Sequence, residues 1–296
     1  MNTKTTKKHL ATFGLLFGAT AWGIIWYPYR LLEHAGISGV TACFYTYSIA
    51  LILGALLFVR HWRALLTLPK AVLWLALAAG WTNLSYVLAV IDGEVMRVML
   101  LFYLSPLWTL ILAHFWLHER VGWLGVVTIV ISVIGAFIML WQPYGGLPLP
   151  QSNAEWMALS SGIGFALTNV LTRRASHLSL KAKSMAVWAG VVIMALIFLL
   201  FQTASLSTAD SIAATQWLLM VGIGLLLMCV TLLVQFGITH IPVTRASVIF
   251  LFELVVAAVT SYWLANEALS VREWLGGILI IAAAIFAAKT ERIKPP

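Results

Sequence analysis

One acidic residue lies inside a long apolar stretch near the C-terminal end of the sequence. Glu253 falls eight residues inside the apolar run 246–265. A carboxylate at such depth in a membrane span costs free energy unless protein, water or a ligand pairs with it. Two interpretations follow. Glu253 is either a cavity carboxylate that meets an amino group or a proton, or a structural carboxyl bonded to a neighbouring helix through Gln235 or Asn169.

Two further polar pairs fall inside apolar runs. Asn83 and Tyr86 are three residues apart and share one helix face, and Thr168 and Asn169 lie in the middle of a later run. These groups would bind the charged ends of a zwitterion, or they would only make interhelical hydrogen bonds worth about 0.6–2 kcal/mol each. The pattern alone leaves both readings open.

The chain has 14 tryptophans, and half of them fall near the ends of apolar runs, where interfacial belts explain them. Trp22, Trp26 and Trp108 lie deeper, and Trp22 and Trp26 are four residues apart, with Tyr29 one turn on from Trp26. Together with Tyr86 and Tyr103 they would line a cavity suited to flat apolar side chains, or they would pack against lipid and helices. The residues assigned to interfacial belts are Trp62, Trp74, Trp123, Trp141, Trp156, Trp217 and Trp274.

A pair of histidines superficially resembles a metal-binding helix. His114 and His118 are spaced i, i+4, and Glu119 follows directly. A catalytic zinc site needs three protein ligands, and Glu119 points about 100° away from His118 on a helix. We therefore expect no metal and no cofactor, and we expect Glu119 and Glu267 to cap or ion-pair helix ends. The predicted cavity residues are Trp22, Trp26, Asn83, Tyr86, Tyr103, Thr168, Asn169, Gln235 and Glu253.

The elements that must position these residues are membrane-spanning helices. Of the 296 residues, 62% are hydrophobic and only 9% charged, which is far too apolar for a soluble domain. Each crossing needs about 20 residues. The sequence therefore predicts an all-α integral membrane protein of ten transmembrane helices with short loops, no nucleic-acid partner and no extramembrane domain. The predicted spans are 10–32, 38–59, 71–90, 96–117, 122–141, 154–172, 182–202, 215–236, 246–265 and 273–288.

Lysine and arginine are distributed very unevenly between the two sides of these spans. Fifteen lie on the side of both termini and three, Arg30, Arg97 and Arg272, lie on the other. Positively charged loops stay in the cytoplasm. The sequence therefore predicts a multi-pass protein of the inner membrane with both termini cytoplasmic.

The two halves of the chain resemble each other. A shift of 148 residues carries Ala89 onto Gly237 and Glu119 onto Glu267. Five spans per half is an odd number, so the second half must insert upside down around a shared central cavity. We predict a first repeat at 1–142, an external linker at 143–153 and an inverted second repeat at 154–296.

These features carry a family resemblance. A fourth span with the motif Leu104-Ser105-Pro106, the terminal Glu119, a following glycine-containing helix and a second copy ending at Glu267 resemble the EamA-type ten-helix transporters of the drug/metabolite transporter superfamily. Within this superfamily, the amino-acid sequence most resembles the YddG-type amino-acid exporters. The resemblance implies a secondary transporter that moves amino acids, aromatic ones included, by alternating access. One departure is the ninth span, which reads Phe252-Glu253-Leu254 where the family commonly has Glu-Pro.

Other functions remain as alternatives at this stage. A nucleotide-sugar or cationic-drug carrier would use the same architecture. An intramembrane enzyme would need a nucleophile and base or a metal set inside the spans, and the sequence offers none that is convincing. No phosphate-binding loop occurs, so transport would draw on solute or ion gradients. The expected partners are a small-molecule substrate and membrane lipids, and the oligomeric state stays open.

Overall fold

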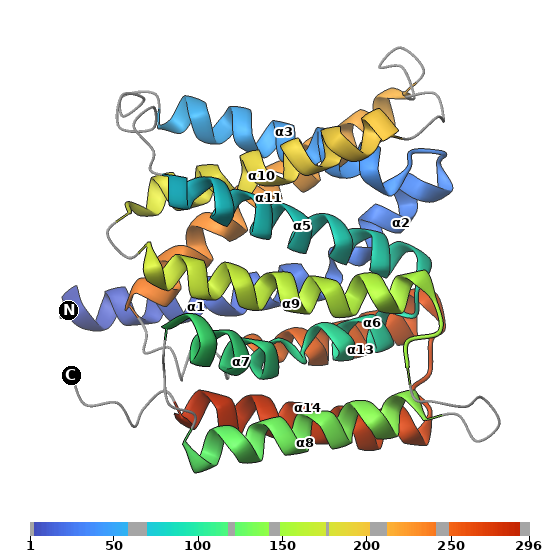
Figure 1. The fold of residues 1–296 in the computed structure, drawn as a ribbon. Coiled ribbons are helices and arrows are strands. Elements are labelled where there is room, and N and C mark those ends of the chain that lie inside the picture. Colours follow the sequence, from blue (N-terminus) through green and yellow to red (C-terminus); the bar gives the residue numbers. More distant parts are fainter. Residues whose placement is uncertain are drawn as a thin grey trace.

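Apolar runs of this length fold as helices because a helix satisfies every backbone hydrogen bond within one segment, which a bilayer core requires. In the computed structural model, every regular element among the described residues is an α-helix (Figure 1). The structure describes residues 3–58, 70–117, 122–141, 149–175, 178–201, 212–240 and 249–290.

The helices group into spans in chain order. In the first half these are α1 (Thr3–Ile24) with α2 (Trp26–His34), α3 (Gly39–Leu57), α5 (Lys70–Asp92), α6 (Val95–Phe102) with α7 (Ser105–Leu117), and α8 (Trp123–Leu140). In the second half they are α9 (Asn153–Arg174), α10 (Leu180–Phe201), α11 (Ala214–His240), α13 (Phe252–Ala265) and α14 (Val271–Thr290).

This grouping confirms the predicted ten-helix fold over the described part of the chain. Six helical stretches are long and apolar enough to cross a membrane by length and composition, and two of these join α1 to α2 and α6 to α7. Two shorter apolar helices lie in α8 and α13. With α9 and α14 the total is ten spans.

Prolines break two of the spans. Pro28 and Pro106 lack a backbone N–H, so the carbonyls of Ile24 and Phe102, four residues earlier, lose their helical partners. The helix accordingly breaks at Ile25 in the first span. In the fourth span it breaks between α6 and α7, at residues 103–104.

The ninth span also breaks, although it has no proline. Its regular helix α13 begins only at Phe252, after a turn at Leu251. The same 148-residue shift that relates the halves carries Tyr103 onto Leu251, so the two breaks are equivalent. Glu253 therefore lies in the first turn of a half-helix, where the helix dipole favours a carboxylate, and not in the interior of a continuous helix.

The packing of the helices repeats between the halves. The first span packs on the eighth and ninth (α1 on α11 and α13), and the sixth span packs on the third and fourth in the same way (α9 on α5 and on α6 with α7). The second and seventh spans, α3 and α10, contact each other, as do the fifth and tenth, α8 and α14 (Figure 1). Exchanging the halves thus maps the contacts onto themselves, as expected for two inverted repeats.

Glycines allow the closest of these contacts. A Cβ on Gly190 of α10 would collide with the backbone of Ala76 on α5, and Gly80 faces Gly190 across the same crossing. Gly14 and Gly18 of α1 likewise admit a neighbouring helix, because Gly14 abuts Leu233 and Gly18 abuts Val234 of α11.

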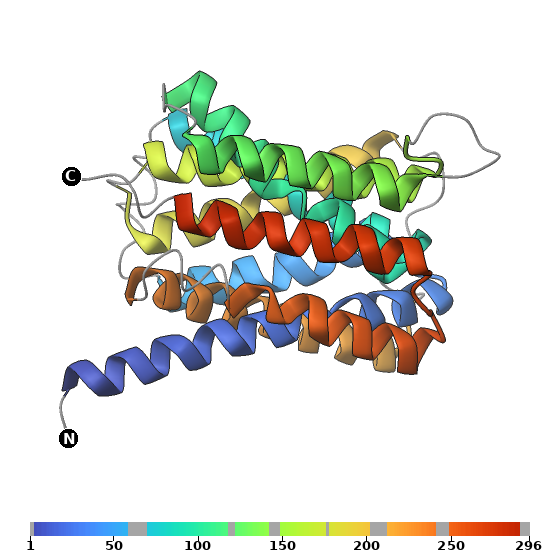
Figure 2. The ribbon, with the colours of Figure 1, turned by 90° about the horizontal axis from the view of Figure 1, so that it is seen from below.

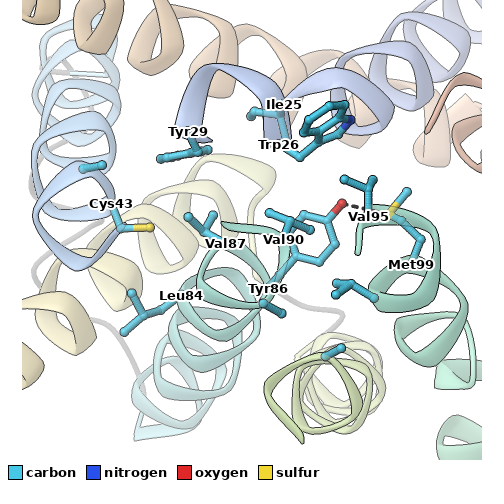
Figure 3. Packing of buried hydrophobic residues seen from close by; sticks show 14 of the residues in the cluster. Ile25, Trp26, Tyr29, Cys43, Leu84, Tyr86, Val87, Val90, Val95 and Met99 are labelled. Atoms are coloured by element: carbon cyan, nitrogen blue, oxygen red, sulfur yellow. Dashed lines mark hydrogen bonds between the residues drawn. The ribbon is translucent and has the colours of Figure 1, made fainter. Parts of the chain in front are cut away.

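The main buried core lies where α2, α3, α5 and α6 meet. Figure 3 shows Tyr86 of α5 pointing toward Met99 of α6, with Trp26 and Tyr29 of α2 on the other side. Cys43 of α3 is fully buried in this cluster. The core is rich in aromatic and aliphatic side chains and surrounds the helix breaks.

The termini share one end of the bundle, because α1 begins and α14 ends there (Figure 2). We call this the terminal end and the other the latch end, where α6, α9 and α14 begin. Most of the predicted linker, together with His118 and Glu119, lies outside the described residues. The division at 143–153 stays a prediction.

Replacing Gly190 with Ala should destabilise the protein by about 1–3 kcal/mol, because the new methyl group forces α10 away from the backbone of Ala76. Gly222→Ala is the matched control, since nothing lies within contact distance of a Cβ there. Thermal unfolding of both variants in detergent measures the difference. Equal unfolding temperatures would contradict the close crossing.

Candidate functional site

A hydrogen bond joins the two equivalent helix breaks. The hydroxyl of Tyr103, at the break of the fourth span, donates toward Oε2 of Glu253 at 2.8 Å and toward the carbonyl of Phe250 at 2.9 Å. Leu254 donates its N–H to Leu251, so Phe250 has no helical partner from that residue. Tyr103 thus satisfies both a buried carboxylate and a carbonyl released by the break.

Aromatic rings surround this junction. Phe102 lies edge-on to Tyr86 at 5.4 Å and to Tyr103 at 5.8 Å between ring centroids, and it contacts Phe165 of α9 at 5.3 Å. The four rings come from both repeats. They form an aromatic cluster next to the Glu253 carboxylate.

A glycine in α9 explains how the helices approach so closely here. A Cβ on Gly162 would lie 2.8 Å from the carbonyl oxygen of Phe102, the carbonyl that Pro106 deprives of its partner. Glycine leaves room for α9 to pack on the broken helix. Many transporters bind substrate between repeats, at discontinuous helices of this kind.

Of the predicted cavity residues, Tyr86, Tyr103 and Glu253 come together at this junction. The Tyr86 hydroxyl lies 2.8 Å from Sδ of Met99. The side chain of Asn83, one turn from Tyr86, is hydrogen-bonded to other parts of the protein. Its amide oxygen accepts from the Tyr47 hydroxyl at 2.8 Å, and its amide nitrogen donates to the carbonyl of Ala79.

Trp26 is fully buried in this structure. Its indole N–H donates to Thr260 of α13 at 3.2 Å, and the guanidinium of Arg30 lies 4.9 Å from the ring centroid. Trp22 is half-buried against the same core. The contacts of these two rings are packing contacts, and their place in a cavity stays a prediction.

The remaining predicted residues lie on α9 and α11. Thr168 donates back to the carbonyl of Gly164 within its own helix at 2.9 Å. Asn169 and Gln235 are half-buried. The side-chain hydrogen bond that the structure shows for Glu253 comes from Tyr103, and a contact of Glu253 with Gln235 or Asn169 stays a prediction.

Sequence reasoning missed Phe102 and Phe165, and it placed Trp108 deep in its span without including it among the predicted cavity residues. Phe102 precedes the Leu104-Ser105-Pro106 motif, so its place at a break was readable from the proline. Trp108 lies one turn beyond the break, and its buried indole N–H has no hydrogen-bond partner among the described residues.

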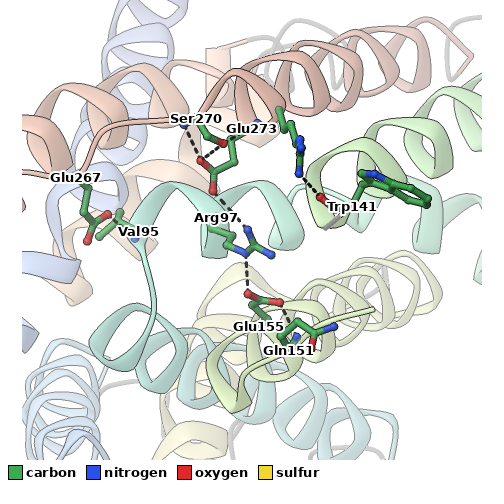
Figure 4. A network of polar contacts seen from close by, with 9 residues as sticks. Val95, Arg97, Trp141, Gln151, Glu155, Glu267, Ser270 and Glu273 are labelled. Atoms are coloured by element: carbon green, nitrogen blue, oxygen red, sulfur yellow. Dashed lines mark hydrogen bonds and ion pairs between the residues drawn. The ribbon is translucent and has the colours of Figure 1, made fainter. Parts of the chain in front are cut away.

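A second polar site lies at the latch end. Arg97 of α6 donates through Nε to Oε1 of Glu155 at 2.6 Å, and its Nη1 lies 3.5 Å from Oε1 of Glu273 (Figure 4). Each carboxylate also caps its own helix. Oε2 of Glu155 accepts from the N–H of Gln151, and Oε2 of Glu273 accepts from Ser270, both at 2.8 Å.

Glu267 also bonds to an arginine with one oxygen and to a helix start with the other. Its Oε1 pairs with Arg30 at 2.8 Å, and its Oε2 accepts from the N–H of Val95 at 2.7 Å, at the start of α6. Arg30 also donates to the carbonyls of Val90 and Gly93 at the end of α5. The prediction that Glu267 fixes a helix end by capping and ion pairing is confirmed.

A cavity of about 220 Å³ opens beside these ion pairs, between the two repeats. Its lining is Glu94, Met96, Arg97, Asn266, Glu267, Ala268, Leu269 and Glu273. Burial raises the pKa of the Glu94 carboxyl, and the nearby carboxylate of Glu273 raises it further. Within the described ranges no group of three or more possible metal ligands occurs.

Ten spans in two inverted halves that meet at paired helix breaks define a multi-pass membrane transporter. Two matches to the model of the EamA-like transporter family cover residues 9–141 and 152–288. The chain belongs to the EamA-like transporter family.

Relatives and a solved structure agree with this assignment. An uncharacterized transporter of Archaeoglobus fulgidus is 25% identical over 74% of this chain and 76% of its own. The uncharacterized transporter YojE of Bacillus subtilis is 25% identical over 80% of each chain. Protein RarD of Salmonella typhimurium is 25% identical over 59% of this chain and 58% of its own. A crystal structure described only as that of a protein aligns over 96% of this chain and 99% of its own, with a TM-score of 0.64 and 16% identity, and so shares the fold.

Replacing Glu94 with Gln should raise the unfolding temperature at neutral pH. A carboxyl whose folded-state pKa is raised loses stability as pH rises through the range between its ordinary and its raised pKa. Glutamine removes this penalty, and it sacrifices no helix cap because Glu94 makes no side-chain cap bond.

The gain should vanish in acid, below the ordinary pKa of a carboxyl, where Glu94 is neutral in both the folded and unfolded states. Unfolding scans across pH in detergent test the sign. A lower unfolding temperature for Glu94→Gln at neutral pH would show that the charged carboxylate stabilises the fold instead.

Proposed function

We propose that this protein is a secondary transporter of amino acids, aromatic ones included, and of related small metabolites. The observation that carries the proposal is the bond from Tyr103 to Glu253 across the two equivalent helix breaks. It puts a buried carboxylate beside a cluster of aromatic rings at the seam of the repeats, where substrates of such transporters bind.

Glu253 is the proposed recognition site for the substrate's ammonium group. An amine is the natural partner of a buried carboxylate, and a charge-assisted hydrogen bond between them is about twice as strong as a neutral one. The Tyr103 hydroxyl holds Oε2 and so orients the carboxylate. A proton on Glu253 in the absence of substrate would give coupling to a proton gradient.

Trp108 is the proposed contact for the substrate's carboxylate. Its indole N–H is buried and lacks a partner among the described residues, which costs free energy unless a ligand or water accepts from it. Phe102, Tyr86 and Phe165 supply apolar faces for the substrate's side chain. The half-buried Asn169 and Thr168 on α9 are further candidates for polar contacts.

Orientation and mechanism belong to the same proposal. The excess of lysine and arginine at the terminal end supports cytoplasmic termini in an inner membrane. Alternating access would open the seam first to one side and then to the other. A carrier of nucleotide sugars or cationic drugs is the second candidate, and the acidic Glu253 favours the cationic drug between these two.

Replacing Glu253 with Gln should weaken transport of amino acids at least about tenfold, because it removes one partner of a buried charge pair. Glutamine keeps the shape and the hydrogen bond from Tyr103. Uptake into proteoliposomes should be measured for an aromatic amino acid and for its hydroxy-acid analogue, which lacks the amine.

The pattern of loss separates the roles of Glu253. Loss for the amino acid alone indicates amine recognition, and loss for both with an altered pH dependence indicates proton coupling. Wild-type rates with an unchanged pH profile would make Glu253 a structural carboxyl and overturn the proposed site. Asp92→Asn, which removes one exposed carboxylate at the end of α5, is the charge control.

Replacing Phe102 with Ala should weaken binding of aromatic amino acids about three- to tenfold more than binding of small ones, because the ring–ring contact is lost. Competition for uptake in proteoliposomes gives the ratio. Phe137→Ala on α8, a half-exposed ring away from the junction, should leave the ratio unchanged. An equal loss for all substrates in folded Phe102→Ala would assign Phe102 to packing.

A further inference from the structure

The three arginines predicted on the face opposite the termini are all bonded at the latch end. Arg30 pairs with Glu267, Arg272 donates to the carbonyl of Trp141 at 2.9 Å, and Arg97 meets two carboxylates. Arg97 belongs to the first repeat, and its two partners Glu155 and Glu273 belong to the second. It is therefore a contact between the parts that alternating access must separate.

The ion pairs of Arg97 are shielded from solvent. The side chains of Arg97, Glu155 and Glu273 are 17%, 11% and 8% exposed. Ion pairs at the surface contribute little stability because solvent and salt screen the attraction between their charges. Burial reduces this screening for the pairs of Arg97. Together the pairs tie the start of α6 to the starts of α9 and α14 (Figure 4).

The same pairs can break without unravelling the helices they join. Ser152 and Ser270 accept from the N–H groups of Glu155 and Glu273, three residues on, and so cap α9 and α14 independently of Arg97. The carboxylates reach Arg97 with the oxygen that the cap does not use. Loss of Arg97 leaves these caps in place and leaves Glu94, Glu155 and Glu273 facing one another as unneutralised like charges.

We infer that Arg97 is a gating residue of the transport cycle, whose paired contacts with Glu155 and Glu273 close the latch end between the repeats. Their release opens the 220 Å³ cavity toward the seam. The inference rests on the alternating access proposed above, and it holds whatever the substrate is.

Accessibility of a cysteine in the cavity tests the gate without any transport assay. Met96 lines the cavity and is 7% exposed, so Met96→Cys in a Cys229→Ser background reports opening. In lipid nanodiscs, which expose both faces, maleimide should label this cysteine about tenfold faster when Arg97 is replaced by Gln. Arg272→Gln, which removes an arginine whose bonds to the described residues go only to the carbonyl of Trp141, should leave the rate unchanged.

The native Cys43 is the internal control for folding, because it is fully buried far from the gate in sequence. Faster labelling of Met96→Cys with Cys43 still protected supports the gate. An unchanged rate, or an equal rise in Arg272→Gln, overturns it. If Arg97→Gln also exposes Cys43, then Glu273→Gln, which removes one pair only, is judged by the same criteria. Absence of amino-acid transport would refute the proposed substrate and leave this test standing.

Discussion

The requirement that every buried backbone group be paired inside a membrane governs the rest of this structure. Pro106 removes one N–H group from the fourth span, and at the turn in the ninth span the N–H of Leu254 bonds to Leu251 instead of Phe250. The released carbonyls are met by side chains and close neighbours: Tyr103 donates to Phe250, and Gly162 lets α9 approach Phe102. The breaks thereby become the place where polar groups from both repeats converge, in a bundle that is otherwise apolar. A site that recognises a charged solute needs such a place, because an unbroken apolar helix offers no polar backbone groups.

At the latch end, each of three carboxylates bonds to two partners at once. Glu155, Glu267 and Glu273 each use one oxygen for a helix N-terminus and the other for an arginine. The turn that aims Glu267 depends on Asn266, which takes a left-handed conformation that asparagine tolerates better than most residues. The caps favour charged carboxylates through the helix dipole, and the arginines neutralise them. Helix ends and repeat contacts are therefore coupled by the same three side chains.

The sequence predicted the ten spans because hydropathy and length are strong signals, and the predicted boundaries lie within a few residues of α3, α5 and α8. The fourth span was predicted as one continuous helix, although the donor that Pro106 lacks made the break at residues 103–104 readable from the sequence. The sequence could not predict the break before Phe252, because no proline marks the equivalent position in the second repeat. Glu253 was identified by its depth, whereas its partner Tyr103 is 150 residues away and only the fold brings them together. The caps Ser152-x-x-Glu155 and Ser270-x-x-Glu273 were readable as motifs, but their second oxygens meet Arg97 only in three dimensions.

The short helix α6 connects the two polar regions. It has eight residues, with Arg97 near its start and Tyr103 directly after its end, so about 9 Å of helix separates these two residues. A helix this short, bounded by Glu94 at its start and by a proline-induced break at its end, moves as a unit more easily than it bends. Any release of Arg97 from Glu155 and Glu273 that shifts α6 would also shift Tyr103 relative to Glu253. Conversely, a ligand that draws Glu253 away from Tyr103 would free the far end of α6. Opening of the gate at Arg97 and ligand binding at Glu253 are then coupled through α6. Because such coupling is reciprocal, gate opening changes the free energy of ligand binding by the same amount as ligand binding changes the free energy of gate opening.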